Sequence, residues 1–311
     1  MEVKLYFERG PGASTIENIV RKAVTDFASQ MGVSLESIRT VALAGDDDYK
    51  RAVKELFDSD SFTNNDYFVG VGKSGTIYNN GYPEHTILIK SIIFDWYIQG
   101  CYTSSLIEEW EPEHQMAPYI ISHELGHCKD NTIRSKISGA VGDQYNTFNL
   151  DEIHRRNYSI LQEEFSACFH AVSFYSRDQY HYELANEKEA FSRAYKKLVN
   201  FKNDKDDADQ ISNVAWHASG LLWSYIVQFC KLWVGKKKTE FEKDKIPSLI
   251  DGLPFLGERF SKLVPTLEEW FYIYPNLPQE ASNFLYIWYD LIEDFDVRFS
   301  ENAQGWCCFW K

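Results

Sequence analysis

The chain has 311 residues, of which 44% are hydrophobic and 16% aromatic, so it carries enough apolar side chain to form a folded core rather than a disordered chain. Its formal net charge of −14 argues against nucleic acid and anionic membrane surfaces as partners, because both of these carry negative charge themselves.

Targeting and redox signals favour a cytoplasmic protein. The first residues, Met-Glu-Val-Lys-Leu-Tyr-Phe-Glu-Arg, lack the apolar core of a secretory signal. The six cysteines show no disulfide spacing, which fits a reducing compartment. Residues 214–230 contain no Asp, Glu, Lys or Arg, but this run is barely long enough to span a bilayer and includes His217 and Gln228. We therefore expect a buried core helix there and no membrane span.

The first elements in chain order predict a small α/β region. Residues 3–7 have the composition of a strand. Ser14-Thr-Ile-Glu17 has the pattern of a capping box, which would open a helix that ends at Gly32. A second, short helix fits residues 48–57.

The next two segments predict strands. Residues 66–78 are punctuated by glycine and indicate a hairpin that turns through residues 72–75. Residues 86–94 are rich in Ile and indicate a further strand. We expect the edge of the 86–94 strand to bind an extended peptide substrate by main-chain pairing, because this mode gives affinity with little demand on side chains.

The segment His123-Glu124-Leu125-Gly126-His127 has the pattern H-E-x-x-H. On a helix, the two histidines lie one turn apart on one face and can bind a single metal ion. The carboxylate of Glu124 can then take a proton from a metal-bound water. Pro118 is acceptable in the first turn of such a helix, and Tyr119 supplies part of an apolar side.

A third metal ligand must come from outside this motif. The longer pattern H-E-x-x-H-x-x-G-x-x-H fails, because Asp130 holds its glycine position and Ile133 its last ligand position. A second helix is predicted over residues 159–175, and it carries Glu163 and Glu164 on an otherwise apolar stretch. Burying a carboxylate there is costly unless it is paired or bound to metal, which favours a ligand.

His-Glu-Leu-Gly-His followed by Glu-x-x-Ala on the next helix resembles the gluzincin metallopeptidases, closest in style to compact intracellular enzymes of the ImmA/IrrE type and the Ste24-like group. The resemblance covers about residues 118–175. It implies zinc as the cofactor, Glu164 as the third ligand and Ala167 as its small neighbour, with Glu163 as the alternative ligand. Some of these enzymes have an Asp where this chain has Cys168, so a carboxylate that would orient a ligand histidine is missing there.

The rest of the chain is predicted to be almost wholly helical, with helices over residues 183–202 and 213–234. One or two further helices are expected over residues 267–295, with a break near Pro275 and Pro278. The apolar end, residues 306–310, should dock on the body of the protein or on a partner. The fold class expected is therefore α+β and mostly helical, with a zincin-like core. Residues 1–110 would form its α/β part, residues 111–205 the active-site helices, and residues 206–311 a helical C-terminal region.

Hydrolysis by a metal-activated water also needs a group that stabilises the oxyanion. His217, on the predicted 213–234 helix, is the first candidate, and Tyr175 and Tyr158 follow. The leading hypothesis is a zinc-dependent peptidase in which His123, His127 and Glu164 bind zinc. Glu124 would be the general base and His217 a catalytic donor.

Two other hypotheses remain open. One is a binding or scaffold protein whose zinc is structural or whose activity is lost, although a structural site has no need of Glu124. The other is a latent protease that a ligand or protein partner controls through the C-terminal helical region, since the chain is longer than a minimal zincin needs.

Overall fold

The computed structural model describes residues 1–7, 12–58, 70–138, 150–176, 182, 189, 192, 196, 233–235, 263–278, 297–302 and 305–310. Almost all of the two predicted helices at 183–202 and 213–234, His217 included, lies outside these residues. The fold is mostly helical with a small mixed sheet, as predicted. The zincin-like core and the division into three domains stay predictions.

The chain divides into two compact units. The first comprises Met1–Val141, Ser166–Glu183 and Lys237–Phe241, and the second Gly142–Phe165, Leu184–Lys236 and Glu242–Lys311. The division falls inside one continuous helix, α5 (Leu150–Ala171), whose last residues belong to the first unit.

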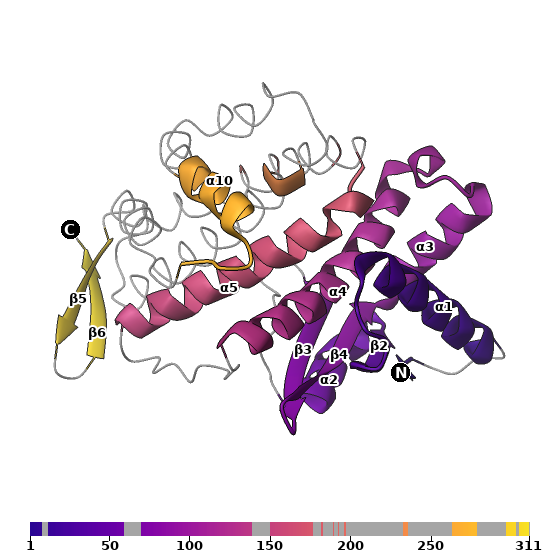
Figure 1. The fold of residues 1–311 in the computed structure, drawn as a ribbon, viewed down its shortest axis with the longest axis horizontal. Coiled ribbons are helices and arrows are strands. Elements are labelled where there is room, and N and C mark those ends of the chain that lie inside the picture. The colour runs from indigo at the N-terminus through magenta and orange to yellow at the C-terminus, as the bar shows by residue number, and fades with distance from the viewer. Residues whose placement is uncertain are drawn as a thin grey trace. The chain divides into compact units, whose positions relative to one another are not determined.

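The first unit is built on a four-stranded sheet (Figure 1) with the strand order β1-β2-β4-β3. The strands β1 (Glu2–Tyr6), β2 (Ile38–Ala44) and β4 (Tyr82–Lys90) are parallel to one another. The last strand, β3 (Gly72–Asn79), pairs with β4 in the antiparallel direction and lies at the edge of the sheet. β4 is therefore an interior strand.

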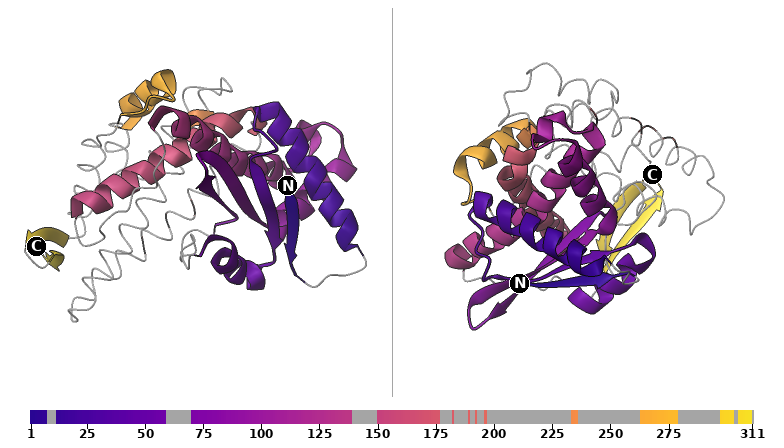
Figure 2. Two further views of the ribbon diagram at one scale, coloured as in Figure 1. Left: turned by 60° about the horizontal axis from the view of Figure 1, so that its bottom comes forward. Right: turned by 90° about the vertical axis from the view of Figure 1, so that its right-hand side faces the viewer.

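Helices cover both faces of this sheet (Figure 2). On one face, α2 (Asp46–Phe57) packs against β1, β2 and β4. Their shared core contains Tyr6, Ala42, Ala44, Tyr49, Ala52, Val53 and Leu88. On the other face lie α1 (Ala13–Met31), which contacts β1, and α4 (Pro112–Ser138), which contacts β3, β4 and α1. The sheet thus forms the middle layer of three.

The start of α1 differs from the predicted capping box. The backbone N–H groups of Thr15 and Ile16 both donate to the carbonyl of Gly12, at 3.0 and 3.1 Å, so Gly12 is the N-cap. Ser14 lies inside the first turn and makes no capping hydrogen bond, so that prediction was wrong. The predicted end is confirmed, because Gly32 closes the helix in the left-handed conformation with φ of 68°.

The predicted turn at residues 72–75 was also wrong, because these residues lie within β3. The hairpin turns at Asn80 and Gly81, whose φ angles of 51° and 82° are the positive values that a two-residue turn between antiparallel strands requires. The predicted 86–94 strand is confirmed up to Lys90. A helix, α3 (Ser91–Thr103), begins directly after it.

The motif helix α4 is longer than predicted. It begins at Pro112, so Pro118 lies in its interior rather than in its first turn, and residue 118 has no N–H for the carbonyl of His114. The short turn η1 (Ile107–Glu109) precedes α4. The helix α5 also begins earlier than the predicted residue 159, and η2 (Val172–Phe174) follows it.

In the second unit, α10 (Leu263–Ile273) packs on the first part of α5. The ring of Trp270 lies 5.5 Å from that of Tyr158 and 5.3 Å from that of Phe165, measured between centroids. The carbonyl of Pro278 accepts a hydrogen bond of 2.7 Å from Gln162 Nε2.

The C-terminal part also contains two strands, which the prediction of an almost wholly helical region did not include. The strands β5 (Val297–Asn302) and β6 (Gly305–Trp310) form an antiparallel hairpin with Asn302 opposite Gly305.

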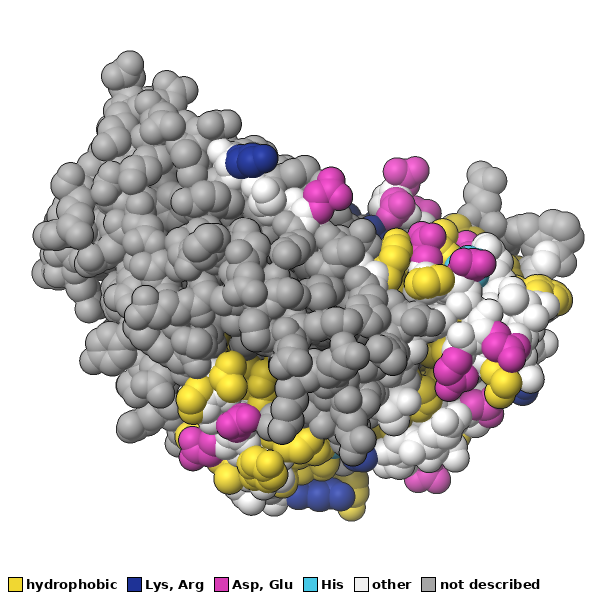
Figure 3. Space-filling view, turned by 90° about the horizontal axis from the view of Figure 1, so that it is seen from above, with side chains coloured by type: hydrophobic (Ala, Val, Ile, Leu, Met, Phe, Trp, Pro, Cys, Tyr) yellow, Lys and Arg dark blue, Asp and Glu magenta, His cyan; other side chains and the backbone are white. Residues whose placement is uncertain are grey.

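Where the structure describes the chain, none of its helices combines the length and the apolarity needed to cross a bilayer. Figure 3 shows one face of the molecule, and on the described part of it Asp and Glu side chains are spread among polar and apolar ones. The acidic excess of the sequence is therefore dispersed there rather than gathered in one patch.

Candidate metal centre

The helix α4 holds the two motif histidines on one face, as their spacing predicts. His123 and His127 lie one turn apart, with ring centroids 4.8 Å from each other and planes at 88°. Both side chains are partly exposed, whereas their neighbours Leu125 and Cys128 are buried. The imidazoles therefore lie at a boundary between core and solvent, where a ligand set needs to be for a substrate to reach it.

The helix α5 crosses α4 at very short range, and the motif itself makes this approach possible. A Cβ atom added to Gly126 would lie 2.7 Å from the carbonyl oxygen and 2.9 Å from the Cα of Ala167. Only a residue without a side chain fits against that backbone. The glycine inside the H-E-x-x-H motif and the alanine on α5 together set the distance between the two helices.

This crossing brings Glu164, less than one turn before Ala167, to the histidine pair. One donor atom from each of His123, His127 and Glu164 lies within 4.8 Å of the others, and all three residues are partly exposed. The side chain of the neighbouring Glu163 instead accepts a hydrogen bond of 3.4 Å from Ser159 Oγ. Of the two adjacent glutamates, Glu164 is the one that joins the histidines.

The donor set of this group suits zinc. Two imidazole nitrogens and one carboxylate oxygen are a common three-ligand set for this ion and leave a position for water. Donors bound to zinc lie roughly 3.3 Å apart in tetrahedral geometry, so modest rotation of the three side chains closes the remaining gap. Because the residues are not fully buried, such rotation has room.

Glu124 points from α4 toward the edge strand. Its side chain is only 6% exposed, and a Cβ atom added to Gly72 would lie 2.8 Å from its Cδ. Burial raises the pKa of the Cys128 thiol, and the charge of Glu124 raises it further. Burial lowers the pKa of the Lys73 ammonium, and the charge of Glu124 partly offsets this. The charge of Glu124 therefore acts on both of these groups, although burial has the larger effect on each pKa.

Cys168 stands next to the ligand pair. Its Sγ lies 3.8 Å from Nδ1 of His123, within hydrogen-bonding distance for sulfur, and its side chain is buried. Asp130, which holds the glycine position of the longer zincin pattern, is buried and forms an ion pair of 2.7 Å with Arg134 one turn later on α4. Asp130 therefore has a structural role within α4.

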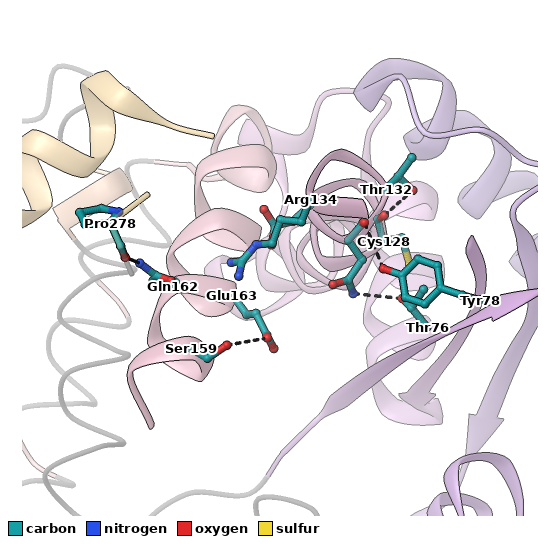
Figure 4. A network of polar contacts seen from close by, with 11 residues as sticks. Thr76, Tyr78, Cys128, Thr132, Arg134, Ser159, Gln162, Glu163 and Pro278 are labelled. Carbon is teal, nitrogen blue, oxygen red and sulfur yellow. Dashed lines mark hydrogen bonds and ion pairs between the residues drawn. The ribbon is translucent and has the colours of Figure 1, made fainter. Parts of the chain in front are cut away.

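A network of hydrogen bonds ties the edge of the sheet to α4 (Figure 4). The buried ring of His85 on β4 adds two contacts, with Nδ1 2.9 Å from Thr76 Oγ1 and Nε2 3.1 Å from Thr132 Oγ1. Asn131 donates to Thr76 at 3.0 Å and accepts from the Tyr78 hydroxyl at 3.3 Å. Burial lowers the pKa of His85 to about 4.

The predicted oxyanion donors are only partly placed. His217 lies outside the described residues. Tyr175 is buried near the site, with its ring 4.9 Å from that of Tyr119, which in turn lies 6.0 Å from the His123 ring. Tyr158 packs on Trp270 of α10, and burial raises its pKa to about 12.

The prediction that substrate pairs with the edge of the 86–94 strand was wrong. β4 is paired along both edges, in parallel with β2 and antiparallel with β3, so it offers no free main chain. Sequence reasoning placed the turn at residues 72–75 instead of at Asn80 and Gly81, and it missed that β3 is the outer strand. The Asn80-Gly81 pair was the signal that could have corrected it.

No family model, curated protein or solved structure matches this chain.

Proposed function

We propose that this protein is a zinc-dependent peptidase that hydrolyses a peptide bond with Glu124 as general base. The observation that carries the proposal is the approach of donor atoms of His123, His127 and Glu164 to within 4.8 Å of one another. The acid of the H-E-x-x-H motif, Glu124, follows His123 directly in the sequence. A purely structural zinc site closes its fourth position with a protein ligand and has no need of an adjacent base.

The residues have separate roles in this scheme. His123, His127 and Glu164 would hold zinc, which, when bound, acidifies a water molecule and polarises the carbonyl of the scissile bond. Glu124 takes a proton from the attacking water onto its carboxylate and later gives it to the leaving amine. Its burial against β3 limits the positions that this carboxylate can adopt.

The test compares zinc content with hydrolysis. Purified full-length chain should bind about one zinc, as three protein ligands and one open position imply, and should cleave fluorescently labelled casein. Glu124→Gln should keep the zinc and lose at least about 10²-fold in rate, because the amide has nearly the same shape but cannot accept a proton. A Glu124→Gln rate equal to that of the wild type would refute the proposal.

The ligand set has a matched control on α5. Glu164→Ala should lose zinc, whereas Glu163→Ala, one residue away, should keep it. Full zinc occupancy in His123→Ala would overturn the metal site as a whole, and loss of zinc only in Glu163→Ala would move the third ligand by one residue.

A further inference from the structure

The space that the Glu124 carboxylate occupies depends on a residue far away in the sequence. A Cβ atom at residue 72 would meet Oε1 of Glu124 and would lie 2.8 Å from its Cδ and 2.9 Å from its Cγ. Side chains do not approach this closely, so any residue with a Cβ at this position would displace the glutamate. The glutamate is buried and cannot simply turn into solvent.

We propose that Gly72 is a positioning residue for Glu124, which holds the carboxylate against the edge strand because it has no side chain. This inference rests on the proposed function, which makes Glu124 the base. It assigns a role to a residue that lies outside the metal-binding motif and contributes through its backbone alone.

The facing of β3 supports this role. Thr76 and Tyr78 both contact Asn131, so the even-numbered residues of β3 face α4. The odd-numbered ones face α2: the ammonium of Lys73 lies 5.5 Å from the Phe57 ring centre, and a Cβ on Gly75 would lie 2.7 Å from the same ring. Gly72 therefore points at α4 by the regular alternation of the strand.

The even-numbered row Gly72, Ser74, Thr76 and Tyr78 grows in size along the strand. Small side chains allow a close approach of strand and helix, and large ones keep them apart. At the first residue of β3 the absence of a side chain leaves room for Glu124, and near its other end Thr76 and Tyr78 form hydrogen bonds with Asn131 of α4.

The position of the Glu124 carboxylate matters for a general base, because proton transfer requires hydrogen-bonding distance to the reacting water. A misplacement of about 1 Å can cost on the order of 10²-fold in rate. Gly72→Ala should therefore retain zinc, since the three atoms nearest to the added Cβ all belong to Glu124 and none to His123, His127 or Glu164, yet lose about 10²-fold in casein hydrolysis.

The contact itself is tested without metal or substrate, by a double-mutant cycle on the melting temperature. Gly72→Ala should lower the melting temperature of the full chain by about 2–6 °C through overpacking. In the Glu124→Ala background the same substitution should cost almost nothing, because the obstructing side chain is gone. Gly75→Ala is the matched control: it overpacks Phe57 from the same strand, so its cost should be the same with Glu124 or Ala at position 124.

The outcomes separate the two proposals. Additive effects of Gly72→Ala and Glu124→Ala, or wild-type hydrolysis by Gly72→Ala, would overturn the role of Gly72. The double-mutant cycle could show coupling between residues 72 and 124 while the wild-type protein binds zinc but cleaves no casein. That result would support the role of Gly72 in positioning Glu124 and would refute the proposed peptidase activity.

Discussion

A thiol lies beside His123 where a carboxylate would hold the imidazole more firmly. The distance of 3.8 Å from Cys168 Sγ to Nδ1 is compatible with a hydrogen bond, but sulfur is a weak acceptor. If His123 held the proposed metal through Nε2, its Nδ1 would carry the hydrogen and would donate a hydrogen bond to the sulfur. Partners of this kind fix the orientation of a ligand histidine and raise its basicity.

Replacing this thiol should strengthen the site. We expect Cys168→Asp to lower the zinc dissociation constant by about tenfold, because a carboxylate accepts a stronger hydrogen bond from the imidazole. Competition with a fluorescent zinc chelator measures the constant. Cys168→Ser, with a neutral acceptor of similar size, is the control and should change it little. Weaker binding in Cys168→Asp than in the wild type would contradict the assigned contact.

At the scale of elements, the crossing of α4 and α5 decides whether three ligands meet. In Gly126→Ala the new methyl would press on backbone atoms of Ala167, which cannot rotate away. The helices must then separate and carry Glu164 from the histidines. We expect zinc affinity to fall about tenfold or more, in line with the cost of overpacking.

A second glycine provides the comparison for Gly126→Ala. A Cβ on Gly100 of α3 would meet the ring of Trp110, so Gly100→Ala is also overpacked, but away from the ligands. Its zinc dissociation constant should match that of the wild type, as measured by the same competition assay. Equal losses of affinity in both variants would point to general destabilisation rather than to the α4 and α5 crossing.

The elements also show what the sequence can predict. His123 and His127 are four residues apart, so helix geometry alone places them on one face of α4, as the sequence predicted. The 86–94 strand was extended too far because Ile92, Ile93 and Phe94 are apolar in either conformation, and they begin α3 instead. Periodicity cannot separate a short buried strand from a buried helical segment.

Sequence patterns of this kind could not predict the contacts between segments that are far apart in the chain. The pairing of β2 with β4 decides which strand lies at the edge of the sheet. The position of the Glu124 side chain depends on Gly72, fifty-two positions earlier in the chain. Gly72 was interpreted as part of a turn, since glycine is common there. Its actual role follows from the helix that packs on it, which no single-sequence pattern specifies.

At the scale of the whole molecule, His85 makes folding stability depend on pH. It is buried between β3, β4 and α4 as a neutral ring, with its pKa lowered by burial from 6.5 to about 4. Below pH 6.5 the unfolded chain takes up a proton that the folded chain refuses until about pH 4. The stability present above pH 6.5 is therefore lost progressively as the pH falls through this window.

The expected loss between pH 7 and pH 5 is about 2 kcal/mol, from 1.36 kcal/mol per pH unit below the unfolded pKa. Urea unfolding of the metal-free protein at the two pH values measures it. His85→Gln keeps a donor and an acceptor but cannot titrate, so its stability should fall by about 2 kcal/mol less over the same interval. Parallel pH profiles for the two proteins would show that His85 does not control the acid response.

The positions of the contacts along the chain bear on the order of folding. His123, His127 and Glu164 come from consecutive helices, so closing one connection of moderate length brings them together. The position of Glu124 also depends on Gly72, so the hairpin of β3 and β4 must be in place. This hairpin joins the sheet through the parallel pairing of β4 with β2, and β2 pairs in turn with β1, so more distant segments must meet. Nonlocal pairing is slower to form than local helix packing. We therefore expect that, when the unfolded chain refolds, His123, His127 and Glu164 come together before the β3 and β4 hairpin packs Gly72 against Glu124, so metal binding should precede the final placement of this carboxylate.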